Sequence, residues 1–65
     1  MKINKEELIR FYFYGWEISA DEEDFPKWFE HSHEKIACLL GYNDQTTGVI
    51  KEEEEIIEEI NKLIK

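Results

Sequence analysis

The chain has 65 residues, of which 16 are acidic and eight are basic, and its formal net charge is −8 at pH 7. A charge of this sign repels nucleic-acid phosphates and anionic lipid headgroups, which argues against direct nucleic-acid or membrane binding. Hydrophobic residues make up 42% of the chain and aromatic residues 14%, too much buriable surface for intrinsic disorder. The sequence therefore predicts one small folded domain over residues 1–65.

A domain of this size buries a small core, which often needs a disulfide, a metal ion or a second chain for stability. The single cysteine, Cys38, excludes an intramolecular disulfide. No cluster of metal ligands stands out either, so we expect neither a metal nor another cofactor. An aromatic core and self-association are the remaining sources of stability. The sequence leaves both a monomer and a homodimer open. One free thiol and an N-terminus without a signal-peptide pattern predict a cytoplasmic protein.

The first predicted element is a helix over residues 5–17. Asn4, with Glu7 three residues later, forms the Asn variant of a capping box at its start. Apolar residues then follow at helical spacing, namely Leu8, Phe11, Tyr12, Gly15 and Trp16. The alternating aromatic residues 11–14 leave a strand open as a rival assignment, because aromatic side chains favour strands. Gly15 on the apolar face indicates either a close approach of another helix or the end of this one.

The second predicted element is a helix over residues 25–40, and we expect the rest of the chain to pack on its apolar face. An acidic connection, residues 21–24, precedes it. Pro26 suits the first helical turn, where its missing N–H is not needed. Gly41 is interpreted as the left-handed stop of this helix. Residues 42–48 contain several turn-forming residues and are predicted to form a polar turn.

A third helix is predicted over residues 49–64, with acidic residues at its start and lysines at its end, as the helix dipole favours. Glu53 falls within its apolar stripe. We expect the first turn to overhang the core so that this carboxylate reaches solvent, and a buried polar contact is the alternative. The predicted fold is thus an all-α, three-helix domain. Its core and self-association residues are Phe11, Trp16, Trp28, Phe29, Ile36, Leu40, Ile56, Ile60 and Leu63.

The two histidines and the cysteine do not predict a catalytic or metal site. His31 and His33 are two residues apart, so on a helix their imidazoles would point in opposite directions and would not share a metal ion. We expect His33 at the edge of the core and His31 on the surface. Cys38 lies two turns after His31 on the outer face, too far for a Cys–His nucleophilic pair. It is interpreted as a small hydrophobic residue covered by another element or chain.

Acidic residues form two groups, one after the first predicted helix and one along the third. They are Asp21, Glu22, Glu23, Asp24, Glu52, Glu54, Glu55, Glu58 and Glu59. Such runs commonly form a solvated face that keeps a small protein soluble. The functional alternative is a docking face for a basic surface on another protein. In its extreme form such a face would imitate the phosphate rows of DNA and occupy a nucleic-acid-binding cleft.

We interpret the chain as a non-enzymatic, acidic binding protein or inhibitor that occupies a basic surface of a larger protein. Its abundance of Ile, Lys and Glu is typical either of the AT-rich genomes of low-GC bacteria and their phages or of hyperthermophiles, and the two-to-one excess of acidic over basic residues favours the first. By analogy of class alone, such genomes encode small proteins of this kind for counter-defence and regulation. The alternative hypothesis is an assembly module that acts as a helical homodimer. An enzyme is the class least expected, because so small a helical domain seldom forms a catalytic pocket.

Overall fold

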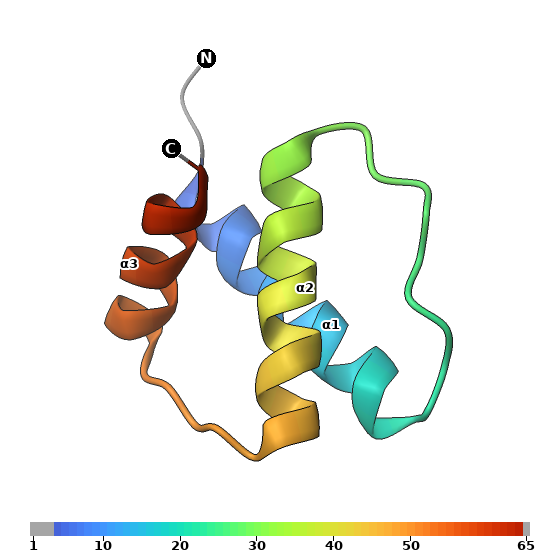
Figure 1. Ribbon diagram of the computed structural model, residues 1–65. Coiled ribbons are helices and arrows are strands. Elements are labelled where there is room, and N and C mark those ends of the chain that lie inside the picture. Colours follow the sequence, from blue (N-terminus) through green and yellow to red (C-terminus); the bar gives the residue numbers. More distant parts are fainter. Residues whose placement is uncertain (1–3, 65) are drawn as a thin grey trace.

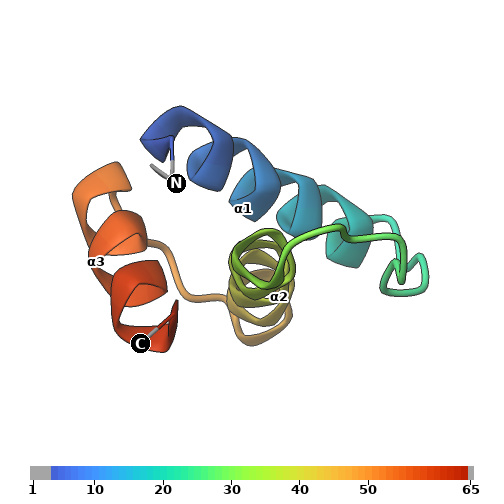
Figure 2. The ribbon, with the colours of Figure 1, turned by 90° about the horizontal axis from the view of Figure 1, so that it is seen from above.

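The computed structural model describes residues 4–64, which form three helices: α1 (Lys5–Ala20), α2 (Ser32–Thr47) and α3 (Glu53–Ile64) (Figure 1). No strand occurs in this range, so the predicted all-α, three-helix class is confirmed. Figure 2 looks along α2 and shows α1 and α3 on adjacent sides of it, with the N-terminal end of α1 next to α3. The interface between α1 and α2 is the most extensive of the three.

α1 begins at Lys5, directly after the predicted cap residue Asn4, and ends three residues after the predicted end. Asn4 has an extended backbone, and its Oδ1 atom accepts a hydrogen bond of 2.8 Å from the N–H of Glu6. This bond satisfies one of the N–H groups that have no partner inside the helix. The rival strand assignment for residues 11–14 is wrong, because all four lie within α1.

The end of α1 is a left-handed turn at Glu22, whose φ of 58° is the only positive value among the described non-glycine residues. The N–H of Glu22 donates to the carbonyl of Ser19 (3.1 Å), and that of Glu23 donates to the carbonyl of Ile18 (3.0 Å). These two bonds form a Schellman motif, in which the left-handed position usually holds glycine. For a residue with a Cβ atom, the left-handed conformation costs about 1–2 kcal/mol of conformational free energy.

Glu22→Gly is expected to raise the free energy of unfolding by about 0.5–1 kcal/mol, because it relieves the left-handed strain at some cost in unfolded-state entropy. Glu22→Gln is the matched control, since it removes the charge and keeps the Cβ atom. Denaturant unfolding followed by circular dichroism measures both variants. Equal stability changes in the two would attribute the effect to charge and contradict the conformational explanation.

α1 and α2 cross at two glycines, one on each helix. A Cβ atom built on Gly15 would lie 1.9 Å from the carbonyl oxygen of Cys38. A Cβ atom built on Gly41 would lie 1.8 Å from the carbonyl oxygen of Tyr12. Both distances are far below any real Cβ contact, so the two backbones touch where no larger residue fits. The close helix approach predicted at Gly15 is therefore confirmed, and the helix stop predicted at Gly41 is wrong, because Gly41 lies inside α2.

Gly15→Ala and Gly41→Ala are each expected to lower the free energy of unfolding by about 3 kcal/mol or more, because the added methyl group meets backbone that has no room to move. Gly48→Ala is the control. Gly48 has a φ of 75° and open space around it, so its substitution should cost only about 1 kcal/mol. If the three alanine variants were equally stable in denaturant unfolding, the glycine contact would not fix the crossing.

α2 is shifted by seven residues relative to the prediction, since it spans Ser32–Thr47 instead of residues 25–40. At its start, Oε1 of Glu34 accepts hydrogen bonds from the N–H groups of His31 (3.2 Å) and Glu30 (3.3 Å). At its end, Gly48 is left-handed and the N–H of Val49 donates to the carbonyl of Asp44 at 2.8 Å. This is a second Schellman motif, so Gly48 provides the stop that was assigned to Gly41.

The predicted polar turn, residues 42–48, is wrong because most of it forms the last two turns of α2. Most of its polar side chains form hydrogen bonds within the helix or with α1. The hydroxyl of Thr47 donates to the carbonyl of Asn43 (2.9 Å), a bond that a helix permits. Ser19 of α1 contacts both Gln45 Oε1 (2.7 Å) and Thr46 Oγ1 (2.8 Å). Contacts with α1 thus override the local preference of these residues for a turn.

Residues 25–30, predicted to begin the second helix, instead form a non-helical segment whose aromatic rings cover α1 and α2. Phe29 lies on Phe11 of α1 with a ring separation of 6.1 Å, and Phe25 lies edge-on to Tyr42 of α2 at 5.6 Å. Phe29 is half-buried, but the side chain of Trp28 is 57% exposed. The core position predicted for Trp28 is therefore wrong.

The buried core joins all three helices, and of the predicted core residues only Ile56 and Ile60 are fully enclosed in it. Its fully enclosed side chains are Leu8 and Tyr12 of α1, Ala37 of α2, and Ile56 and Ile60 of α3, and the half-buried Phe11, Trp16, Ile36 and Leu40 pack around them. Leu63 was also predicted in the core, but it is 51% exposed. α3 begins at Glu53 and not at residue 49 as predicted. Residues 49–52 belong to the non-helical connection between α2 and α3. The Glu53 side chain is exposed, as expected.

Candidate functional site

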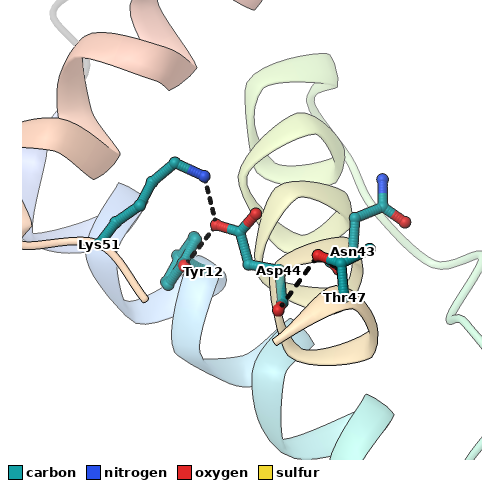
Figure 3. Close-up of polar contacts among 5 residues, drawn as sticks. All are labelled: Tyr12, Asn43, Asp44, Thr47 and Lys51. Carbon is teal, nitrogen blue, oxygen red and sulfur yellow. Dashed lines mark hydrogen bonds and ion pairs between the residues drawn. The ribbon is translucent and has the colours of Figure 1, made fainter. Parts of the chain in front are cut away.

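A buried polar network joins α1, α2 and the connection to α3 (Figure 3). The Tyr12 hydroxyl donates to Oδ2 of Asp44 at 2.6 Å, and Nζ of Lys51 lies 2.7 Å from the same oxygen. Tyr12 and Asp44 are both buried. Charged hydrogen bonds of this kind are short and strong, and a buried carboxylate needs them to offset its lost hydration. This network was not predicted, because Asp44 was expected in a polar turn and lies instead in α2.

The chemistry of the network favours a structural role. Burial, and then the hydrogen bond and negative charge of Asp44, raise the pKa of Tyr12 far above its ordinary value. The phenol therefore stays protonated and acts as a donor at neutral pH, the opposite of an activated nucleophile or base. Two surface hollows, one between α1 and α3 and one on α1, are lined by other residues and not by Tyr12, Asp44 or Lys51. The network thus fixes the connection between α2 and α3 against α1.

Lys51→Met is expected to destabilise the fold by about 3 kcal/mol, because it leaves the Asp44 carboxylate buried without its cation. Tyr12→Phe should cost about 2 kcal/mol through the loss of one charged hydrogen bond. Lys62→Met is the control, since Lys62 is exposed on α3, and its change should stay within about 0.5 kcal/mol. Thermal and denaturant unfolding of the three variants give the comparison. Indistinguishable Lys51→Met and Lys62→Met proteins would show that the buried ion pair has no structural weight.

Cys38 was predicted on the outer face of its helix, but it is fully buried where α2 crosses α1. The helix register explains the error, since the buried face of α2 passes through Ala37, Cys38 and Gly41. Burial raises the pKa of the thiol to about 11, from an ordinary value of 9.0. A protonated, enclosed thiol is a packing group and a poor nucleophile.

Stability is expected to fall as the pH rises above about 9. Between about pH 9 and 11 the unfolded state loses the Cys38 proton while the folded state keeps it, so unfolding releases a proton and is favoured by alkali. The loss is about 2 kcal/mol over this range, and Tyr12 adds to it above pH 10. Denaturant unfolding at several pH values measures the slope. Cys38→Ala should flatten the slope near pH 9.5, and an unchanged slope in that variant would contradict the assignment.

The imidazoles of His31 and His33 do not point in opposite directions, as was predicted, but stack with ring centres 5.4 Å apart and planes 8° from parallel. The reason is that His31 precedes the helix and has an extended backbone (φ −125°, ψ 146°). His31 is exposed and His33 half-buried, as expected. Over residues 4–64 no group of three or more His, Cys, Asp or Glu side chains is placed to hold a metal ion.

The two predicted acidic groups lie at opposite ends of the molecule. Residues 21–24 follow α1, and residues 52–59 span the end of the α2–α3 connection and the first part of α3, on the far side of α2 in both views (Figures 1 and 2). The side chains of Asp21, Glu22, Glu23, Asp24, Glu52, Glu54, Glu55 and Glu58 are exposed, and that of Glu59 is half-buried. The structure therefore brings the predicted binding residues together within each group but not into one face.

A groove between α1 and α3 combines one of these groups with apolar side chains. Its floor contains Ile9 of α1 and Ile57 of α3, both half-buried. Around the floor lie the acidic residues Glu6, Glu53, Glu54 and Glu58, together with Lys5 and Asn61. Only Glu54 and Glu58 of this lining were among the predicted binding residues, and the others, including Glu6 and Ile9, were not. No local pattern marks them, because the groove arises only when the ends of two separate helices come together.

The carboxylates of this groove are not paired with cations elsewhere in the described chain. Lys51 and Asp44 form the only ion pair within residues 4–64. Lys5 lies among the groove residues without forming an ion pair with any of them in this range. Among the described residues, the groove is therefore an apolar strip surrounded by an excess of negative charge.

Comparisons with protein-family models, with curated proteins and with solved structures find no match for this chain. Within residues 4–64, no helix has the length and apolar character needed to cross a bilayer.

Proposed function

We propose that this chain is a small, acidic, non-enzymatic binding protein that docks on a basic surface of a larger protein. The observation that supports this function best is the acidic start of α3, where exposed glutamates surround apolar side chains without described cationic partners. A purely solubilising surface needs dispersed charge and no apolar strip at its centre. An acidic rim around an apolar centre has the composition expected of a docking surface.

The net charge of −8 supports the same function through long-range attraction. A field of one sign steers an oppositely charged partner during diffusion and raises the association rate, and salt weakens this effect. A nucleic-acid-binding cleft is one kind of basic surface that such a protein would occupy. Inhibition would then follow from simple occupancy, with no chemical step in this chain.

A second candidate function, a homodimeric assembly module, is favoured by a separate observation. Three aromatic side chains are exposed, Phe13 (46%) and Tyr14 (38%) of α1 and Trp28 (57%) of the non-helical segment. The rings of Tyr14 and Trp28 lie 5.9 Å apart and form one surface. Aromatic residues are enriched in protein interfaces, and association through them would depend little on salt.

Partner capture from an extract of the source organism, repeated at low and high salt, tests the proposed function. Proteins bound through acidic docking should be basic and should dissociate between about 50 and 300 mM salt, as screening shortens the range of attraction. The combined variant Glu54→Lys, Glu55→Lys, Glu58→Lys should lose them, with circular dichroism confirming that it is folded. The control Glu22→Lys, Glu23→Lys, Asp24→Lys reverses the same number of charges at the other end of the molecule.

Two outcomes would contradict acidic docking. One is capture that resists salt and survives the α3 charge reversal. The other is a salt-insensitive dimer in analytical ultracentrifugation that Trp28→Ala converts to a monomer, with no basic partner captured at any salt concentration. The second outcome would favour the assembly module.

A further inference from the structure

We infer that the groove between α1 and α3 receives a basic amphipathic helix of the partner, with an apolar stripe that faces the groove floor and flanking lysine or arginine residues that face its rim. This inference rests on the proposed function and specifies the site and the chemistry of its ligand. It depends on the joining of two surface hollows into one track.

The hollow between α1 and α3 continues onto the outer face of α1. The second hollow is lined by Glu6, Ile9, Arg10, Phe13, Tyr14 and Glu17, and it shares Glu6 and Ile9 with the first. An apolar track therefore runs from Ile57 across Ile9 to Phe13. Ile9 and Phe13 are four residues apart on α1 and so lie one helical turn apart. Apolar side chains at this spacing match those of a second helix that lies alongside, the mode in which amphipathic helices bind grooves.

Both margins of the apolar track carry acidic side chains. Glu53, Glu54 and Glu58 come from α3, and Glu6 and Glu17 come from α1. The two basic residues of the combined lining are Lys5 and Arg10. Five carboxylates thus face two cations, which leaves an excess of three negative charges. In a helix with cations on both sides of an apolar stripe, the stripe would pack on the apolar floor and the cations would pair with the carboxylates at both margins.

Charge also excludes the main competing occupants. A second copy of this chain offers no basic helix among its described elements, because acidic residues outnumber Lys and Arg in each of α1, α2 and α3. A nucleic acid or an anionic membrane would bring further negative charge to the groove. A cationic protein helix is the occupant whose charge opposes that of the site.

The test uses a synthetic probe peptide of about 18 residues, about 27 Å of helix, made of Leu, Lys and Ala with leucines at helical spacing. The control peptide has the same composition and charge in scrambled order. The full chain is titrated with each peptide by calorimetry, and contacts are mapped by amide chemical-shift changes. The amphipathic peptide should bind at least tenfold more tightly than the scrambled one, with the largest shifts at Ile9, Phe13 and Ile57.

Variants then locate the site. Phe13→Ser removes an exposed part of the track, and Glu54→Gln with Glu58→Gln removes charge from the rim, and each should weaken binding of the amphipathic peptide at least fivefold. Glu22→Gln with Glu23→Gln removes the same charge from the opposite end and should leave the affinity within twofold of the unmodified chain. Circular dichroism confirms the fold of each variant.

The outcomes separate this inference from the proposed function. Equal affinity for both peptides, abolished by salt, would overturn the groove site and leave acidic docking intact. If the Glu22→Gln, Glu23→Gln variant lost as much affinity for the amphipathic peptide as the Glu54→Gln, Glu58→Gln variant, the groove site would also be overturned and acidic docking would remain. No binding of either peptide at about 50 mM salt, where screening is weak, would overturn the inference, and the capture of basic partners would then decide the proposed function independently.

Discussion

The rest of the structure depends on the contact between the backbones of α1 and α2 at Gly15 and Gly41. Each glycine faces a carbonyl oxygen of the opposite helix, so the contact is reciprocal and fixes both the position and the rotation of the two helices. The reciprocal arrangement permits weak Cα–H···O hydrogen bonds, which recur where helices pack closely. It also compensates for the small size of the core, because two helices in backbone contact exclude water without large side chains. Cys38 is enclosed at this crossing and serves as a small packing residue.

This crossing sets the positions of the buried polar network and of α3. The Tyr12 hydroxyl reaches Asp44 only because the two helices are this close, and Asp44 in turn binds Lys51 of the connection that leads to α3. Ile56 and Ile60 then enter the core beside Leu8 and bring the acidic start of α3 next to the start of α1. The groove is thus a consequence of core packing, because its apolar residues Ile9 and Ile57 pack against the core. A surface formed in this way is held rigid from beneath, which lowers the entropic cost of binding a partner.

The parts of the fold that local rules determine were predictable from the sequence, and the parts set by contacts between helices were not. The Asn4 cap, the helical nature of residues 11–14 and the burial of Ile56 and Ile60 follow from capping and periodicity. The register of α2 was not predictable. Pro26 matches the pattern of a helix start and Gly41 that of a helix end, but the start of α2 is capped by Glu34 and its end is at Gly48. The acidic group on α3 was identified, but the apolar floor of the groove was not, since Ile9 and Ile57 are 48 residues apart in the sequence. The stacking of His31 and His33 was not predicted either, because it depends on α2 beginning after His31.

The most direct test of this account is a nuclear Overhauser measurement on the isotopically labelled chain at the α1–α2 crossing. A Cβ position built on Gly15 lies 3.0 Å from the amide nitrogen of Tyr42, and one built on Gly41 lies 3.2 Å from that of Trp16. A glycine Hα proton occupies this direction, so strong cross-peaks should join the Hα of Gly15 to the amide proton of Tyr42 and the Hα of Gly41 to that of Trp16. Absence of both cross-peaks, with all four residues assigned, would contradict the crossing and every feature that depends on it.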